Sequence, residues 1–337
     1  MKIVTLTLSI LFGTSCISST ASADEVGAPA NNPVDIREWL VPWEDSRPRD
    51  PYVADDGKVW FVGQRGHYVA SLDPVSGEFE RYDLDLGTGP HNLIVDDQGM
   101  VWYAGNLARH IGVLDPESGG ITKFEMPDER ARDPHTLTFD SEGDIWFTVQ
   151  HGNFVGKLSR SNREVSLQAV PTPRSRPYGI VVDRDDVPWA VEFGSNKLLK
   201  IDPEDLGVTE IALPSEDSRP RRLDVTSDGN VWYVDYALGN LGRYIPASGE
   251  FTEWPLPNGA DSLPYGMAVD RDDRIWLVET GVSPNRFVGF DTKTGKFISR
   301  SKIPSGGGSI RHMNYYEPRG EVWFGTDTNY IGRARVH

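Results

Sequence analysis

Cysteine is almost absent from this sequence, because Cys16 is the only one among 337 residues. A single cysteine cannot pair within its own chain, which excludes a disulfide-stabilised scaffold. Basic charge is also scarce: 34 Lys and Arg residues stand against 50 Asp and Glu residues, for a formal net charge of −16. This balance disfavours a sequence-independent nucleic-acid binder and a protein that docks on anionic lipid, since both need a basic surface.

Local catalytic motifs are missing as well. The chain contains no HExxH metal-binding pair, no GxSxG nucleophile turn and no glycine-rich phosphate loop. Its aspartate-rich turns do not match a calcium-binding loop. Segments with the apolar period of a helix are absent too. Any active site must therefore be assembled by the fold from residues far apart in the sequence.

Only one longer apolar run occurs. It covers residues 3–12, follows a lysine and precedes the small residues Ala21-Ser22-Ala23. This pattern predicts a secretory signal peptide over residues 1–23, cleaved after Ala23, and hence a periplasmic or secreted protein. Lipoprotein processing at Cys16 is an alternative, although the residues before it are a poor context. The run is too short to span a bilayer and no second one follows, so we expect no membrane insertion. Residues 24–34 are expected to form a flexible lead-in.

What the chain does have is tryptophan at a regular spacing. Seven of its ten tryptophans recur at intervals of 42 to 47 residues, each just after a turn and at the start of a short apolar run. Another apolar run precedes each turn, and two more follow each tryptophan segment, the last with a proline-containing end. The seven are Trp60, Trp102, Trp146, Trp189, Trp232, Trp276 and Trp323.

Four short strands in each unit of about 43 residues predict an all-β fold, a β-propeller of seven four-stranded blades over residues 35–337. A closed ring buries both faces of every blade, and each tryptophan is expected to act as an apolar wedge between neighbours. The last unit begins at Ile310 and stops after its third strand. Residues 35–39 resemble a fourth strand, so we predict that they complete the seventh blade and close the ring. A closed ring needs no partner, so we expect a monomer.

Polar residues recur eleven positions before the tryptophans, where the innermost strand of each blade should begin at the mouth of the central channel. Propellers place ligands there, because the channel is pre-formed and the loops around it vary. In blade one, Tyr52 is assigned to this position. The histidines among them have two interpretations, either metal ligation or acid–base chemistry, or packing at the channel rim. The other six residues are His91, His135, Tyr178, Arg221, Tyr265 and His312.

Carboxylates recur three or four residues after the tryptophans, at the ends of the second strands on the same face. They could bind a divalent cation through oxygen, or pair with the arginines beside them. Those arginines could also hold an anionic ligand, and the sequence leaves these options open. The carboxylates are Glu192, Asp235, Glu279 and Asp327, and the arginines are Arg176, Arg219, Arg221, Arg222 and Arg311.

Several segments of the repeat carry a family resemblance. They include Pro177-Tyr178-Gly179-Ile180, the segment from Trp189 to Glu192, Asn329-Tyr330-Ile331-Gly332, and Thr252-Glu253-Trp254-Pro255-Leu256-Pro257. The repeat resembles that of the streptogramin B lyases, also called virginiamycin B lyases, over nearly all of the chain after residue 35. The resemblance implies a propeller enzyme that opens a cyclic depsipeptide by elimination at an ester. In that reaction a base removes the α-proton, and a carbonyl bound to magnesium stabilises the enolate.

The resemblance also implies roles for single residues. The general base of the last blade falls on His312, the blade-one tyrosine on Tyr52, and the last-blade carboxylate on Asp327. The family's blade-six histidine is replaced here by Tyr265, and its glutamate before the base is replaced by Ile310. Two of the expected metal partners therefore differ in this chain.

Three functions stay open. The first is a lyase of altered, unknown specificity, with His312, Tyr52 and Tyr265 as catalytic residues. Its divalent metal, expected to be Mg²⁺, would be held by Asp327, Glu279 and His91. The second is a metal-dependent lactone or ester hydrolase, and the third is a non-catalytic module that holds a sugar, peptide or partner protein. In each case we expect a small-molecule or peptide ligand in the central channel. The residues expected to contact it are His135, Tyr178, Glu192, Arg222 and Asp235.

Overall fold

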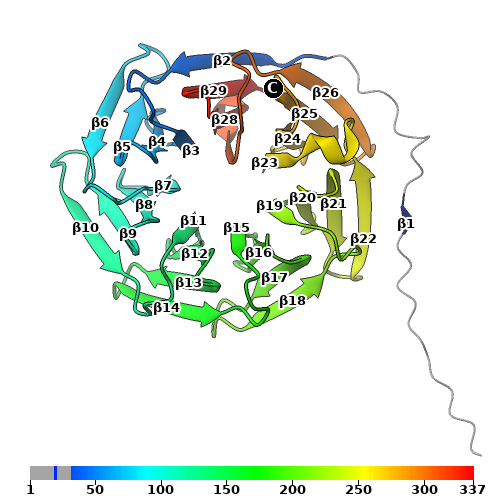
Figure 1. Cartoon of the computed structure of the whole chain (residues 1–337), viewed down its shortest axis with the longest axis horizontal. Coiled ribbons are helices and arrows are strands. Elements are labelled where there is room, and N and C mark those ends of the chain that lie inside the picture. Colours follow the sequence, from blue (N-terminus) through cyan, green and yellow to red (C-terminus); the bar gives the residue numbers. More distant parts are fainter. Residues whose placement is uncertain (1–18, 21–31) are drawn as a thin grey trace, which may run out of the picture.

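The computed structural model describes residues 19–20 and 32–337. These residues form seven antiparallel sheets arranged as blades around one axis (Figure 1). Within the described residues there is no α-helix, and the only helical turns are two short 3₁₀ segments, η2 (Gly259–Ser262) and η3 (Glu317–Arg319). The predicted seven-bladed β-propeller is confirmed. No helix in this part of the chain is long and apolar enough to cross a membrane.

Each blade is a meander whose first strand lies innermost and whose last strand lies at the rim (Figure 1). The first three blades are β3 (Pro48–Val53), β4 (Val59–Gly63), β5 (Tyr68–Leu72) and β6 (Phe79–Asp83); β7 (Leu93–Val95), β8 (Val101–Gly105), β9 (His110–Leu114) and β10 (Ile121–Glu125); and β11 (Pro134–Phe139), β12 (Ile145–Val149), β13 (Phe154–Ser159) and β14 (Glu164–Ala169).

The next three blades repeat this order. They are β15 (Pro177–Val182), β16 (Pro188–Glu192), β17 (Lys197–Ile201) and β18 (Val208–Ala212); β19 (Pro220–Val225), β20 (Val231–Asp235), β21 (Asn240–Ile245) and β22 (Glu250–Pro255); and β23 (Pro264–Val269), β24 (Ile275–Glu279), β25 (Arg286–Asp291) and β26 (Lys296–Lys302).

The seventh blade joins the two ends of the chain. Its inner strands are β27 (Met313–Tyr316), β28 (Glu321–Gly325) and β29 (Tyr330–Arg335), and its outer strand is β2 (Asp35–Leu40). Strand β2 pairs antiparallel with β29 in unbroken register, which confirms the predicted closure. Two side chains reinforce it. Glu38 accepts hydrogen bonds from the backbone and hydroxyl of Ser305 at 2.6 and 2.7 Å, and Asn329 donates to the carbonyls of Val41 and Trp43.

The predicted signal peptide lies outside the described residues except for Ser19 and Thr20. These two form β1 (Ser19–Thr20), which pairs in parallel with β22. Cys16 and the cleavage site after Ala23 are not described, so export and cleavage stay predictions. The end of the predicted lead-in is held by blade six, since Asn32 and Val34 hydrogen bond to serine hydroxyls of β26.

The repeating tryptophans are buried between blades, as predicted. Trp232, for example, packs against Val288 and Phe290 of the following blade. In four blades an aspartate six residues earlier accepts the indole N–H, and in one a threonine does so. In the second blade the same aspartate, Asp96, also accepts the amide of Met100 in the turn. One side chain thus fixes both the turn and the wedge, which explains why the two recur at a constant spacing.

Trp39 on β2 provides a test of ring closure. Its ring is 9% exposed and stacks on Trp323 of the central strand at 5.4 Å between centroids. We expect Trp39→Ala to lower the free energy of unfolding by about 3 kcal/mol, because it removes this buried contact from the closing strand. Leu40 on the same strand is 58% exposed, so Leu40→Ala should cost less than about 0.5 kcal/mol. Urea unfolding of both variants would measure the difference; equal costs would contradict a closing role for β2.

Candidate functional site

The pairing of first and second strands shows which residues of different blades are equivalent. Pro48 pairs with Gly63 just as Pro134 pairs with Val149, three residues after the tryptophan. The residue after this proline begins the channel lining, so Arg49 occupies that position in blade one. The assignment of Tyr52 to it is wrong, because Tyr52 lies three residues further on, opposite Trp60.

In the seventh blade, the position predicted for His312 is also wrong, by one residue. Met313 pairs with Phe324, whereas the equivalent Leu137 pairs with Phe147. The turn containing η3 makes this hairpin one residue longer. Counting back eleven residues from the tryptophan therefore stops one residue short, and Arg311, not His312, is the equivalent of His135. His312 takes the next position along the strand.

The first strand shifts register against the second in five blades, where two consecutive residues come to the channel. The hydrogen bonds of blade two have the same pattern. There, His91 donates its backbone N–H to Ala104, and Ala104 donates its own to Asn92. A bulge turns neighbouring side chains toward the same side of a strand. The first ring consists of Arg49, His91, His135, Tyr178, Arg221, Tyr265 and Arg311. The second ring consists of Asp50, Asn92, Thr136, Gly179, Arg222, Gly266 and His312.

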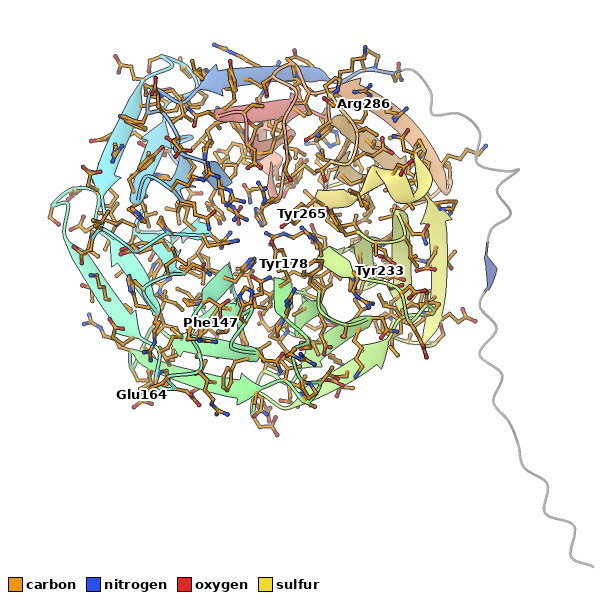
Figure 2. All side chains as sticks on the ribbon, in the orientation of Figure 1. Phe147, Glu164, Tyr178, Tyr233, Tyr265 and Arg286 are labelled. Carbon is orange, nitrogen blue, oxygen red and sulfur yellow. The ribbon has the colours of Figure 1, made fainter. Side chains whose placement is uncertain are left out.

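In the first ring, imidazole and phenol groups form a continuous arc. The His91 and His135 rings lie 3.6 Å apart and the His135 and Tyr178 rings 4.1 Å apart, measured between centroids. The hydroxyl of Tyr178 hydrogen bonds to that of Tyr265, and both residues lie toward the axis of the ring (Figure 2). Arg221 stacks over the Tyr265 ring at 4.2 Å. The arc thus joins four blades through side chains alone.

In the second ring, Arg222 reaches across the channel. It donates to the Thr136 hydroxyl at 3.0 Å and to the Arg311 carbonyl at 2.9 Å. Its Nη2 lies 3.6 Å from the carboxylate of Asp50, so one side chain from blade five contacts blades three, seven and one. Gly179 leaves the room it needs, because a Cβ there would lie 3.3 Å from Arg222 Cδ and 3.0 Å from the Arg221 carbonyl.

Asp50 is the carboxylate buried at this point. It accepts from Asn92 at 3.1 Å, and its other oxygen lies 3.6 Å from Arg49 Nε. Burial alone would raise the pKa of Asp50, but Arg49, His312 once it is protonated at acidic pH, and Arg222 outweigh burial and lower the pKa. Its backbone is left-handed, with a φ of 46°, a conformation that costs energy and persists only where its surroundings enforce it.

The three channel histidines are neutral at physiological pH. Burial, followed by the field of Arg222 and the weaker one of Arg49, lowers the pKa of His312 to about 4 against the opposing effect of Asp50. Burial and the same two arginines hold the pKa values of His91 and His135 well below the ordinary value. Each of the three imidazole groups has one buried nitrogen without a hydrogen-bond partner among the described residues: His312 Nδ1, His91 Nδ1 and His135 Nε2.

The predicted metal ligands do not come together. Within residues 19–20 and 32–337, no three His, Cys, Asp or Glu side chains are placed to hold a metal ion. Asp327 is bound through both of its oxygens by Arg311. Glu279 accepts hydrogen bonds from Arg300, Ser262 and Asn258 around its own loop. His91 lies instead beside His135. The donors that Mg²⁺ prefers are therefore already used by cations or loop groups.

Two residues that were predicted to contact the substrate, Asp235 and Glu192, accept hydrogen bonds from nearby loops, as Glu279 does. Asp235 accepts three backbone amides of its own blade, including those of Arg219 and Ala237. Glu192 accepts the Ser195 hydroxyl. Both are fully buried. These carboxylates hold the loops that frame the channel, whereas His135, Tyr178 and Arg222 do line it.

Tyr52 belongs to another part of the channel. It lines a cavity of about 390 Å³ with Asp55, Asp96 and Phe139, where the first strands of blades one to three end. Burial, followed by the charge of Asp55, raises its pKa. Four residues of the two rings were not predicted from the sequence, namely Arg49, Asp50, Asn92 and Thr136. Pro48-Arg49 repeats the proline-containing pair of the other blades and could have revealed the first of them.

Glu192 allows a pH test of this assignment. Burial, followed by the nearby Glu210, raises its pKa to about 7. Since the folded pKa lies above the unfolded one, the native state loses stability as pH rises from about 4.5 to about 7. Glu192→Gln removes this loss, so the variant should gain about 2 kcal/mol relative to the wild type between pH 4.5 and pH 8. Urea unfolding at both pH values measures the gain. The exposed Glu164→Gln is the control, and a pH-independent difference for Glu192→Gln would contradict the assignment.

Comparisons with known proteins agree with this architecture. Residues 19–282 match the Virginiamycin B lyase family. A solved streptogramin B lyase is 25% identical over 91% of this chain and 99% of its own, with a TM-score of 0.81. A catalytically inactive histidine-to-alanine variant of virginiamycin B lyase from Staphylococcus aureus, solved with quinupristin, is 23% identical over 90% and 99%, also with a TM-score of 0.81.

More distant structures share only the fold. Hydrazine synthase of Kuenenia stuttgartiensis is 15% identical over 88% of this chain and 97% of its own, with a TM-score of 0.72. A search of curated proteins gives no match. The family match covers more than half of the sequence and confirms the resemblance seen in the repeat motif, so this chain belongs to the Virginiamycin B lyase family.

Proposed function

We propose that this protein is a lyase that breaks a C–O bond by elimination at the mouth of its channel. The observation that carries the proposal is the meeting of a neutral histidine, His312, with the buried guanidinium groups of Arg49 and Arg222. An elimination next to a carbonyl needs a base for the α-proton and positive charge for the oxygen that becomes an enolate. His312 of the second ring supplies the base. Arg222 of the second ring and Arg49 of the first supply the positive charge.

His312 is suited to accept the proton. Its ring is uncharged at neutral pH, and its buried Nδ1 has no partner among the described residues. A base whose pKa is near 4 is weak in the free protein, but the cause of that low value is mainly burial and the two arginines. Negative charge that develops on a substrate oxygen beside Arg49 and Arg222 offsets their field, and so raises the basicity of His312 as the reaction proceeds.

Tyr265 is suited to protonate the leaving oxygen. Burial alone would raise its pKa, but Arg221 and Arg49 outweigh burial and lower it. Burial, and next the charge of Tyr265, raise the pKa of its partner Tyr178. The environment thus lowers the pKa of one phenol and raises that of the other. Tyr265 is therefore the better proton donor, and Tyr178 supports it through a hydrogen bond. Tyr265 thus acts as a proton donor, and does not take over the metal-binding role of the family histidine that it replaces.

The magnesium ion that the family resemblance implies does not fit the described residues, because Asp327 and Glu279 are already engaged. The elimination that we propose does not involve this ion. The role of the cation at the enolate is assigned to Arg49 and Arg222, whose charges are fixed at any physiological pH.

A non-catalytic ligand-binding module is the second candidate. The excess of arginine over carboxylate at the channel mouth favours it, since such a site binds an anion whether or not chemistry follows. A hydrolase is the third, because a neutral histidine could also activate water.

The reaction test uses a panel of esters, lactones, depsipeptides and ethers that carry a carbonyl β to the leaving oxygen. The lyase should give an α,β-unsaturated product without uptake of oxygen from H₂¹⁸O, whereas a hydrolase would incorporate it. His312→Ala should lower kcat about 10²- to 10⁴-fold, and Tyr265→Phe about 10²-fold. His337→Gln, outside the channel, is the matched control. An unsaturated product formed equally fast by His312→Ala would refute the assigned base, and no turnover across the panel would favour a binding module.

A further inference from the structure

One edge of the Arg49 guanidinium group makes no hydrogen bond within the described residues. The residue is 5% exposed, and its Nη1 donates to Gln64 at 3.1 Å, which fixes the plane of the group. Its Nε and Nη2 are buried and have no hydrogen-bond partner among the described residues. These two N–H groups lie side by side and parallel, the pair that binds both oxygens of a carboxylate.

Arg222 adds a third free donor. Its Nε and one terminal nitrogen are used by the Arg311 carbonyl and Thr136, while Nη2 is buried without a hydrogen-bond partner in the described part of the chain. Buried donors are nearly always satisfied, and leaving a charged one unpaired is costly. Arg49 Nε and Arg222 Nη2 each face a carboxylate oxygen of Asp50 at 3.6 Å, an ion-pair distance that is too long for a hydrogen bond. All three N–H groups therefore still lack a hydrogen-bond acceptor.

The charge of the site matches one negative group. Arg49 and Arg222 carry two positive charges, Asp50 carries one negative charge, and the three histidines are neutral. These groups thus carry a net charge of +1 within a protein whose formal net charge is −16, and the half-buried Arg221 of the first ring adds a further positive charge. A monoanion would lower this excess of positive charge.

We propose that the substrate carries a carboxylate on the carbon that loses its proton, and that Arg49 binds this carboxylate as a fork with Arg222 beside it. The inference rests on the elimination proposed above and names its substrate class: β-alkoxy, β-glycosyloxy or β-acyloxy carboxylates. A sugar chain that contains a 4-linked uronic acid is one example.

The reaction balances without a further reactant. The α-proton passes to His312, and the electrons of its C–H bond form a double bond between the α and β carbons. The β C–O bond breaks, and the leaving oxygen takes a proton from Tyr265. The products are an unsaturated carboxylate and an alcohol, or a carboxylic acid from an acyloxy group. Removal of a proton next to a carboxylate gathers a second negative charge on its oxygens, which explains why two guanidinium groups are needed there.

Binding is tested first and without turnover. Isothermal titration would compare glucuronate, its methyl ester, glucose and inorganic phosphate as probes of the full chain. We expect glucuronate to bind at least ten times more tightly than the ester or glucose. Arg49→Lys keeps the charge but removes the fork, and should weaken glucuronate binding about tenfold. Arg49→Gln should weaken it further. Arg335→Gln, on the outer side of blade seven, is the control, and circular dichroism checks that each variant is folded.

Three results would overturn the substrate class. They are equal affinity for glucuronate and its ester, unchanged affinity in Arg49→Lys, and tighter binding of phosphate than of glucuronate. Elimination is then assayed on 4-linked uronate oligosaccharides and their methyl esters. Selective binding of glucuronate without any elimination would refute the lyase and leave the carboxylate site standing. Elimination of the esters at the same rate as the acids, unaffected by Arg49→Lys, would refute the carboxylate site and leave the lyase standing.

Discussion

Arg222 is the side chain on which the centre of this propeller depends. It leaves blade five, crosses the channel and bonds to groups of blades three and seven while facing Asp50 of blade one. Four of the seven sheets are thereby connected at the axis by one cation. The register shift that turns two consecutive residues of blade five inward, and the missing side chain at Gly179, are the backbone conditions for this arrangement. A guanidinium group can satisfy several blades at once because its donors lie in a rigid plane.

The same arrangement sets the chemistry of the channel. Burial, together with the fields of Arg49 and Arg222, lowers the pKa values of the three histidines, and Arg221 with Arg49 lowers the pKa of Tyr265. The excess positive charge is expensive to bury and is retained at the point where blades converge, which is the usual position of a propeller ligand. Under the function that we propose, the reaction takes place at this cationic centre, and arginine supplies the positive charge.

The fold could be predicted from the sequence because each blade repeats a local solution. The aspartate that binds the turn and the indole, as Asp96 does for Met100 and Trp102, recurs with its tryptophan, and the N-terminal strand visibly completes the last unit. The site could be predicted only in part. A fixed distance from the tryptophan located His91, His135, Tyr178 and Tyr265, but one extra residue in the η3 turn displaced His312, and Tyr52 was preferred to Arg49. Carboxylates such as Glu279 were misjudged because their partners, including Arg300, come from strands that no spacing rule connects to them.

The most direct test of this account is the ionisation of His312 in the folded protein. Heteronuclear NMR of the histidine rings, recorded across pH with and without saturating glucuronate, would measure it, and His312→Asn would assign the signal. We expect His312 to stay neutral down to about pH 4 in the free protein, and its pKa to rise when the carboxylate offsets the charges of Arg49 and Arg222. A histidine that titrates near its ordinary value and does not respond to the carboxylate would contradict it.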